Sequence, residues 1–135
     1  MPGARPIVDG LFTDGPEGPR LRAGRCLACG RPHFPASDVC PYCSADGCEP
    51  IAVGPTGRLY LYTTVLSRPP GYRGEVPYGF GVVELDGGLR VITRLTETRL
   101  DRLRPGLAVR LAIEPLFTDE DGSTVLGWAF RPETA

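Results

Sequence analysis

Near the start of the chain, four cysteines form two C-x-x-C pairs that ten residues separate. These pairs are Cys26 with Cys29 and Cys40 with Cys43. The surrounding segment is short and rich in glycine and proline, so it cannot fold by apolar burial alone and needs a cross-link or a metal. Gly30 can adopt the left-handed backbone of a metal-binding knuckle, and Pro41 stiffens the second pair. We therefore predict a zinc ribbon over residues 21–50.

The four cysteine thiolates are the donor set that a structural zinc ion prefers. Zinc binds four thiolates in a tetrahedron with Zn–S distances of about 2.3 Å, and such a site keeps no position open for water. Iron is the alternative metal, since it also accepts thiolate ligands. In either case we expect a structural centre. Replacing Cys29 by serine should then remove the metal and the folded ribbon together.

Two further potential ligands lie in or beside the ribbon. His33, the only histidine, stands between the cysteine pairs and could replace a cysteine as ligand. Four thiolates already suffice, so we expect the His33 side chain to be exposed. Cys48 could be a fifth ligand or a redox thiol. The simpler interpretation is a small residue in the loop that leaves the ribbon.

Composition and charge exclude several classes of protein. The sequence has no apolar run of membrane-spanning length, and the opening MPGARPIVDG lacks the apolar core of a signal peptide. We therefore expect a cytoplasmic protein, in which paired cysteines are more often metal ligands than disulfides. All fifteen basic residues are arginines, and the net charge of −1 is not the strongly basic footprint of a nucleic-acid domain.

Residues 1–20 are predicted to form an extended N-terminal arm. The segment DGPEGPR is turn-forming, and no helical period continues through it. Leu21 to Arg25 is expected to form the strand that leads into the first cysteine knuckle.

After Pro50 the sequence becomes rich in aromatic and β-branched residues at strand spacing. Five strands are predicted, at Gly57–Ser67, Tyr78–Leu85, Leu89–Leu95, Leu107–Ile113 and Thr124–Phe130. The turn Asp86-Gly87-Gly88 favours a hairpin, and one or two helical turns are expected before Pro105-Gly106. The predicted fold class is mainly β, with an N-terminal rubredoxin-like zinc ribbon followed by a five-stranded OB-fold barrel over residues 51–135.

Alternation of apolar residues indicates which side chains share a face of each strand. Three sets follow: Leu89, Val91, Thr93 and Leu95; Leu107, Val109, Leu111 and Ile113, which we expect to point inward; and Leu126, Trp128 and Phe130. Tyr60 and Tyr62 are expected to fill core and surface positions of the barrel.

The connection from Arg68 to Pro77 is ten residues long, whereas hairpin loops usually have two to five. One interpretation is a flexible surface loop. The other is a binding loop, stiffened by proline, that presents Arg68, Tyr72 and Arg73 to a partner or an anionic ligand.

The sequence offers no catalytic constellation of its own. A serine or cysteine nucleophile needs a histidine base beside it, and the single histidine lies in the ribbon. The chain has no lysine, so a phosphate-binding loop of the G-x-x-x-x-G-K type is excluded. No carboxylate pair stands out. A stand-alone enzyme is therefore the least favoured hypothesis.

The order of the motifs resembles a known family. The matching stretches are RCLACGRPHFPASDVCPYC, GRLYLYTTV, PYGFGVVELDGGLRVITRL and LRPGLAVRL. Together they are similar to the small zinc-ribbon/OB-fold proteins that associate with acyl-CoA enzymes, long catalogued as a domain of unknown function. The resemblance covers roughly residues 20–131, and the strand pair after the ribbon is its most specific part.

This resemblance implies a non-catalytic subunit of a thiolase-superfamily enzyme, a related aldolase or a hydratase-like partner. Such a subunit completes or stabilises the complex and helps to place the CoA thioester. It implies that the four cysteines bind structural zinc. Arginine forks match the phosphates of CoA. Candidate contacts with CoA or the partner are Arg68, Tyr72, Arg73 and Tyr78.

The N-terminal segment departs from many members of that family. They begin with a helix that often carries an aromatic pair, whereas RPIVDGLFTDGPEGPR cannot form a long helix. In this respect the chain looks more like the members that pair with thiolases of aromatic-succinate or steroid degradation. Leu11 and Phe12 are expected to dock on a partner as an extended arm instead.

The alternative hypothesis is a single-stranded nucleic-acid-binding module, because zinc ribbons and OB barrels bind nucleic acids elsewhere. The aromatic residues that could stack bases are Tyr60, Tyr62, Tyr72, Tyr78 and Phe80. However, the residues before Ile51 include five arginines and six acidic residues, and the residues from Ile51 onward include ten of each. This balance opposes the basic groove that such binding needs, so we favour the accessory subunit.

Overall fold

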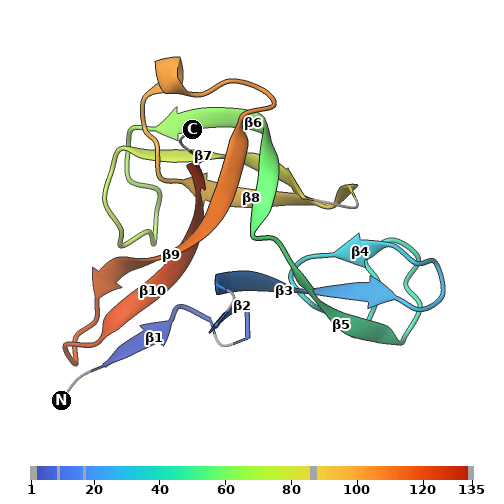
Figure 1. Cartoon of the computed structure of the whole chain (residues 1–135). Helices are drawn as coiled ribbons and strands as arrows, with labels where there is room; N and C mark the ends of the chain where they lie inside the picture. Colours follow the sequence, from blue (N-terminus) through green and yellow to red (C-terminus); the bar gives the residue numbers. More distant parts are fainter. Residues whose placement is uncertain (1–2, 9, 17, 86–87, 134–135) are drawn as a thin grey trace.

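The computed structural model describes residues 3–8, 10–16, 18–85 and 88–133. The chain forms a small β ribbon beside a larger β barrel, with the N-terminal strand along one side of the barrel (Figure 1). In the described part of the chain, no helix has both the length and the hydropathy to cross a membrane.

Five strands close the barrel. They are β6 (Thr56–Val65), β7 (Tyr78–Leu85), β8 (Arg90–Leu95), β9 (Ala108–Thr118) and β10 (Thr124–Pro132). β6, β7 and β8 form an antiparallel meander, β8 pairs in parallel with β10, and β9 pairs with both β10 and β6. This closure is the Greek-key order of an OB-fold, so the predicted barrel is confirmed.

The predicted strands are confirmed with small shifts at their ends. β9 continues to Thr118, five residues past its predicted end, because Phe117 and Thr118 pair with β10. The expected helical turns are reduced to one 3-10 turn, Leu100–Arg102. β7 and β8 pair as a hairpin, but Asp86 and Gly87 of the predicted turn lie outside the described residues.

The core follows the predicted alternation. Leu89, Val91, Thr93 and Leu95 are all buried, as are Leu107, Val109 and Leu111. Ile113 is only half-buried, as is Trp128, its cross-strand partner on β10. β10 departs from this alternation: Val125, Ala129 and Phe130 are buried, whereas Leu126 and Trp128 of the predicted set are half-buried.

The N-terminal arm pairs with strands of this chain. β1 (Ala4–Pro6) pairs in parallel with β10, and β2 (Phe12–Gly15) pairs with the start of β3 (Gly18–Cys26). The Phe12 side chain packs against the core of this chain. Leu11 and Phe12 are both half-buried, and their docking on a partner stays a prediction.

The ribbon is built on β3, which contains the predicted strand Leu21–Arg25. β4 (Pro32–His33) and β5 (Cys48–Val53) pair with β3 from its two sides. Leu21 and Ala23 of β3 belong to the same buried cluster as the barrel residues. The ribbon and the barrel therefore share one core.

Candidate metal centre and ligand-contact surface

Two similar turns present the four cysteines. In the first, the N–H of Gly30 donates to the carbonyl of Cys26 at 2.9 Å, and in the second, that of Ser44 donates to the carbonyl of Cys40 at 3.0 Å. Gly30 and Ser44 both have positive φ, at 78° and 66°. The left-handed residue after each pair reverses the chain and turns both thiols of that pair to the same side.

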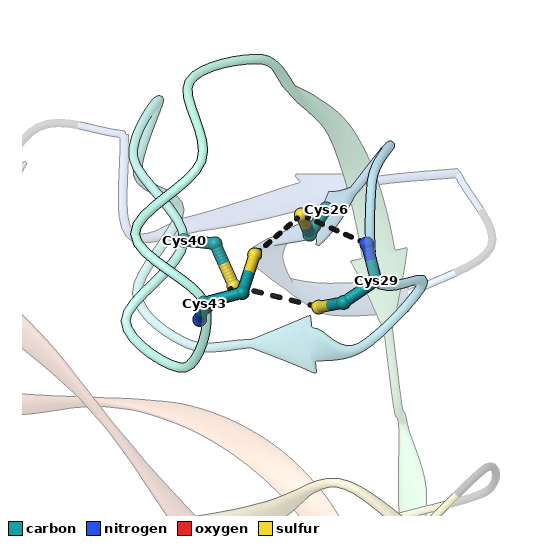
Figure 2. Close-up of side chains that lie close together, drawn as sticks. All are labelled: Cys26, Cys29, Cys40 and Cys43. Carbon is teal, nitrogen blue, oxygen red and sulfur yellow. Dashed lines mark hydrogen bonds between the residues drawn. The ribbon is translucent and has the colours of Figure 1, made fainter.

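The four sulfur atoms converge on one point (Figure 2), and all lie within 4.8 Å of one another. The Sγ atoms of Cys26 and Cys43 are 3.6 Å apart, and those of Cys29 and Cys40 are 3.7 Å apart. A tetrahedron with Zn–S bonds of about 2.3 Å would separate its sulfurs by about 3.8 Å. The cluster therefore fits a four-coordinate metal ion, and the donor set suits zinc.

Backbone N–H groups favour the thiolate form of Cys26 and Cys40, which is the form that binds a metal. Cys26 Sγ accepts N–H groups of Ala28 and Cys29 at 3.3 Å each, and Cys40 Sγ accepts those of Tyr42 and Cys43 at 3.4 and 3.5 Å. The Cys29 N–H is the main cause that lowers the pKa of Cys26 to about 6. Burial raises the pKa of Cys40, but its two donors outweigh burial and the net pKa is lowered.

The pKa of Cys43 changes in the opposite direction. The N–H of Ala45 lowers its pKa, but proximity to the Cys26 sulfur and burial outweigh that donor and raise the pKa of Cys43 to about 12. Four thiols this close cannot all ionise without a cation between them. The crowding of the sulfurs is thus itself a feature of a metal centre.

The prediction that His33 is exposed is wrong, since only 3% of its surface is accessible. β4 pairs with β3 so that His33 lies opposite Gly24, and a Cβ on Gly24 would come within 2.5 Å of the His33 Nε2. Nε2 also lies within hydrogen-bond distance of the backbone N–H and carbonyl of Ser37, at 3.2 and 3.1 Å. His33 therefore braces the loop between the two knuckles and is not in the sulfur cluster.

Cys48 lies in a strand, not in the expected loop. It begins β5 and is the direct cross-strand partner of Cys26. Burial and the neighbouring Cys26 raise the pKa of the Cys48 thiol. It lies beside the cluster, whose four members do not include it.

The loop from Arg68 to Pro77 folds back onto the barrel. The rings of Tyr72 and Tyr78 are 4.8 Å apart, and the Tyr72 hydroxyl lies 3.3 Å from the carbonyl of Glu75. The Arg73 guanidinium lies 4.3 Å from the centre of the Phe117 ring. The structure thus brings Tyr72, Arg73 and Tyr78 together at the barrel rim, and both Arg68 and Arg73 are exposed to solvent.

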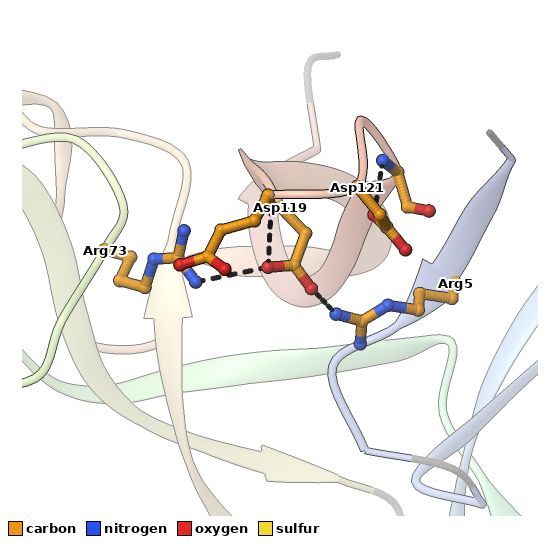
Figure 3. Close-up of polar contacts among 6 residues, drawn as sticks. Arg5, Arg73, Asp119 and Asp121 are labelled. Atoms are coloured by element: carbon orange, nitrogen blue, oxygen red, sulfur yellow. Dashed lines mark hydrogen bonds and ion pairs between the residues drawn. The ribbon is translucent and has the colours of Figure 1, made fainter.

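One carboxylate joins this loop to the N-terminal strand. Asp119, just after β9, is ion-paired with Arg73 at 3.4 Å and also with Arg5 of β1. Figure 3 shows the two guanidinium groups approaching Asp119 from opposite sides. The N–H of Glu120, followed by Arg5, lowers the pKa of the Asp119 carboxyl. Three segments that are far apart in sequence are therefore held at one end of the barrel.

A cleft of about 590 Å³ lies beneath this end of the loop. Its lining includes Glu75, Tyr78, Arg94, Glu114 and Phe117. Arg94 and Glu114 form an ion pair at 2.9 Å. Sequence reasoning found Tyr78 but missed Arg94, Glu114 and Asp119, because each looks like an ordinary surface charge until the strands are paired.

Comparison with known proteins places the two units in described families. A family model for the ChsH2 rubredoxin-like zinc ribbon domain matches residues 13–49. A second model, for the ChsH2 C-terminal OB-fold domain, matches residues 51–114. The order of the two matches is the order of ribbon and barrel described above.

Relatives that match most of the chain agree with these matches. A DUF35 domain-containing scaffold protein of Pyrococcus furiosus is 30% identical over 84% of this chain and 83% of its own length. The benzoylsuccinyl-CoA thiolase subunit BbsA of Thauera aromatica is 28% identical over 84% of this chain and 76% of its own. Among solved structures, a chain of the Ltp2-ChsH2(DUF35) aldolase is 30% identical, covers 84% of both chains and gives a TM-score of 0.62.

Proposed function

Because this chain belongs to the DUF35 family, whose members join a ChsH2-type zinc ribbon to an OB-fold, we propose that it is a non-catalytic accessory subunit of a thiolase-superfamily acyl-CoA enzyme. The observation that carries this proposal is the likeness to a chain of the Ltp2-ChsH2(DUF35) aldolase over 84% of both chains. A likeness over most of both chains supports the same kind of role in a hetero-oligomer.

The proposed partner is a thiolase or a thiolase-like aldolase that acts on an aromatic or steroid acyl-CoA. The relative named as a benzoylsuccinyl-CoA thiolase subunit supports an aromatic acyl-CoA, and the aldolase supports cleavage of a carbon–carbon bond. The accessory subunit would stabilise the complex and help to position the CoA thioester.

In this proposal the metal is zinc, held by Cys26, Cys29, Cys40 and Cys43. Zinc would supply a fixed tetrahedral cross-link between the two knuckles, with no open coordination position for chemistry. Because ribbon and barrel share one core, this cross-link would also hold the ribbon in a fixed position against the barrel.

The candidate contacts with CoA or the partner are Arg68, Tyr72, Arg73 and Tyr78. Arg68 is exposed and makes no ion pair among the described residues, so it can offer its guanidinium to a phosphate. Arg73 is already paired with Asp119, so its role is to hold the loop in place for Tyr72 and Tyr78. Tyr78 lines the cleft described above, and the ring of Tyr72 lies 4.8 Å from that of Tyr78, at the position where OB-folds commonly take ligands.

Nucleic-acid binding has less support at this cleft. Glu75 and Glu114 line it, and Glu114 neutralises Arg94. A single strand needs a continuous positive groove to follow its phosphates. The acidic residues of the lining would therefore repel the phosphates of a nucleic acid.

The experiment is to assay the purified thiolase-superfamily partner on its acyl-CoA with and without this chain. We expect the partner alone to lose most of its activity or its stability, and added chain to restore it. Equal activity and equal thermal stability of the partner without this chain would contradict the proposal.

A further inference from the structure

A β-bulge in β6 changes which residues face outward on the barrel. The pairing with β7 shifts between Leu59 and Leu61, so that Tyr60 is the extra residue. Leu59 points into the core, Tyr62 packs against the core, and Tyr60 and Leu61 between them are 44% and 58% exposed. A bulge places two successive side chains on one face. Here it puts a tyrosine and a leucine side by side on the outside.

These two residues begin an apolar row across three strands. Leu61 pairs with Val82 of β7, and Val82 pairs with Ile92 of β8. Directly paired residues share a face of the sheet, and Ile92 is 66% exposed. The outer side of β6, β7 and β8 therefore presents a contiguous aliphatic strip, which in monomeric proteins commonly marks an interaction site.

Arginine and tyrosine pairs border this strip on the side of the ribbon. Arg90 lies 3.9 Å from the centre of the Tyr60 ring, and Arg31 of the ribbon lies 5.2 Å from that of Tyr42. A depression of about 410 Å³ connects them, lined by Arg31, Tyr42 and Arg90 among others. The outer face, defined as Arg31, Tyr42, Tyr60, Leu61, Val82, Arg90 and Ile92, thus extends from the barrel onto the ribbon.

Arg31 supplies the charge of this face among the described residues, because Glu84, which lines the same depression, neutralises Arg90. Arg90 is paired with Glu84 at 3.1 Å. Among the described residues, no acid lies within ion-pair distance of Arg31. The net charge of the whole chain is −1, so the positive charge of Arg31 is a local feature of this face.

We propose that the outer face binds the catalytic subunit of the acyl-CoA enzyme through an apolar patch bordered by carboxylates. This inference rests on the proposed function and names the surface and the chemistry of the partner. Aromatic and arginine side chains around an apolar centre are the composition of protein-binding hot spots. Charge complementarity favours a carboxylate on the partner opposite Arg31, which is exposed and makes no ion pair with any residue that the structure describes.

Two other occupants fit the face less well. A second copy of this chain would bring the same arginines against each other, and like charges oppose such pairing. A single-stranded nucleic acid would need aromatic platforms for its bases, but Leu61, Val82 and Ile92 at the centre are aliphatic and offer none.

The test uses the thiolase-superfamily subunit that is recovered with the tagged chain from its own cells. The affinity of that subunit is measured for wild type and for Ile92→Glu, Ile92→Ser and Arg31→Glu, after zinc content and melting temperature show that each variant is folded. Leu100→Glu and Arg104→Glu are matched controls, since Leu100 is 51% exposed in the 3-10 turn and Arg104 is an exposed arginine outside this face.

We expect Ile92→Glu and Arg31→Glu to raise the Kd about tenfold or more, Ile92→Ser to raise it less, and both controls to bind like wild type. Arg31→Glu should also reduce the salt dependence of binding. If all three face variants bind as tightly as wild type, the proposed function stands and this surface is overturned. If no thiolase-superfamily subunit is recovered, both proposals fail.

Two other measurements test whether the outer face binds a different molecule from the proposed catalytic subunit. If wild type alone forms a dimer in sedimentation and Ile92→Glu is a monomer, the face binds a second copy. If Arg31→Glu weakens binding to a fluorescein-labelled oligothymidine and leaves protein binding unchanged, the face binds nucleic acid.

Discussion

Phe34 of the ribbon lies edge-on to Trp128 of the barrel, with ring centroids 5.6 Å apart and an interplanar angle of 79°. Phe34 directly follows β4, and Trp128 is in the strand that closes the barrel. Both rings pack against the shared core. The conformation of the metal-binding ribbon is therefore coupled to the barrel through an aromatic contact.

Removal of the metal should be visible at Trp128. Trp128 is the only tryptophan, so its fluorescence reports on the contact with Phe34 without interference. We expect a strong chelator, or the substitution Cys29→Ser, to unfold the ribbon and shift the emission to longer wavelength. Structural zinc in small domains contributes roughly 10–16 kcal/mol to folding. Cys48→Ser is the control and should keep both zinc and spectrum. A folded, soluble Cys29→Ser chain with an unchanged spectrum would contradict the metal centre.

Loss of the contact between Phe34 and Trp128 should weaken the energetic coupling between the ribbon and the barrel. Phe34→Ala removes the ring against Trp128 but leaves all four cysteines, so zinc should stay bound. We expect the free energy of unfolding of the barrel to fall by about 1–3 kcal/mol, because an edge-to-face pair and half-buried apolar area are lost. Chemical denaturation followed at Trp128 measures this change. An unaltered unfolding midpoint would show that ribbon and barrel are independent.

Gly24 should tolerate no larger residue while His33 is present. A Cβ there would lie 2.5 Å from Nε2 of the buried ring. We expect Gly24→Ala to cost about 1–3 kcal/mol of stability through overpacking. The double variant Gly24→Ala with His33→Ala should be destabilised by less than the two single changes together, since the clash is relieved. Additive costs in that double-mutant cycle would argue against the contact.

Asp119 should control the order of the loop from Arg68 to Pro77. Asp119→Asn removes both ion pairs, so hydrogen exchange should accelerate in that loop and in β1. Asp121→Asn is the control, because the Asp121 carboxylate accepts the N–H of Ser123 and makes no ion pair among the described residues. Equal exchange in the two variants would mean that Asp119 does not hold the loop.

The same carboxylate predicts a pH dependence. The folded pKa of Asp119 is lowered, chiefly by the N–H of Glu120 and by Arg5. Its contribution to stability is therefore present above the ordinary carboxyl pKa of about 3.9 and is lost as pH falls through the lower folded value. The stability difference between wild type and Asp119→Asn should accordingly shrink below about pH 4. A difference that is constant down to pH 2 would contradict this assignment.

Local patterns in the sequence were sufficient to predict the ribbon and the five barrel strands. Cysteine spacing fixes the knuckles, and apolar alternation fixes the inward face of strands such as Leu89–Leu95, because both depend on neighbouring residues. The bulge at Tyr60 was not predictable, since GRLYLYTTV alternates without interruption and only pairing with β7 makes Tyr60 the extra residue.

Long-range pairing explains the remaining differences. β1 has only three residues, and its parallel pairing with β10 joins Arg5 to Val125 across the whole chain. Burial of His33 depends on its position opposite Gly24. The Asp119 carboxylate is ion-paired with Arg73 and Arg5, which are 46 and 114 residues away in the sequence. Such contacts follow from the register of strands, which a single sequence does not specify.

The most direct test of the central claim is a native pull-down of the tagged chain from its own cells, with and without nuclease, read by mass spectrometry. The accessory-subunit proposal predicts a near-stoichiometric thiolase-superfamily protein that survives nuclease treatment. Recovery of only ribosomal or other nucleic-acid-bound proteins that disappear with nuclease would contradict it.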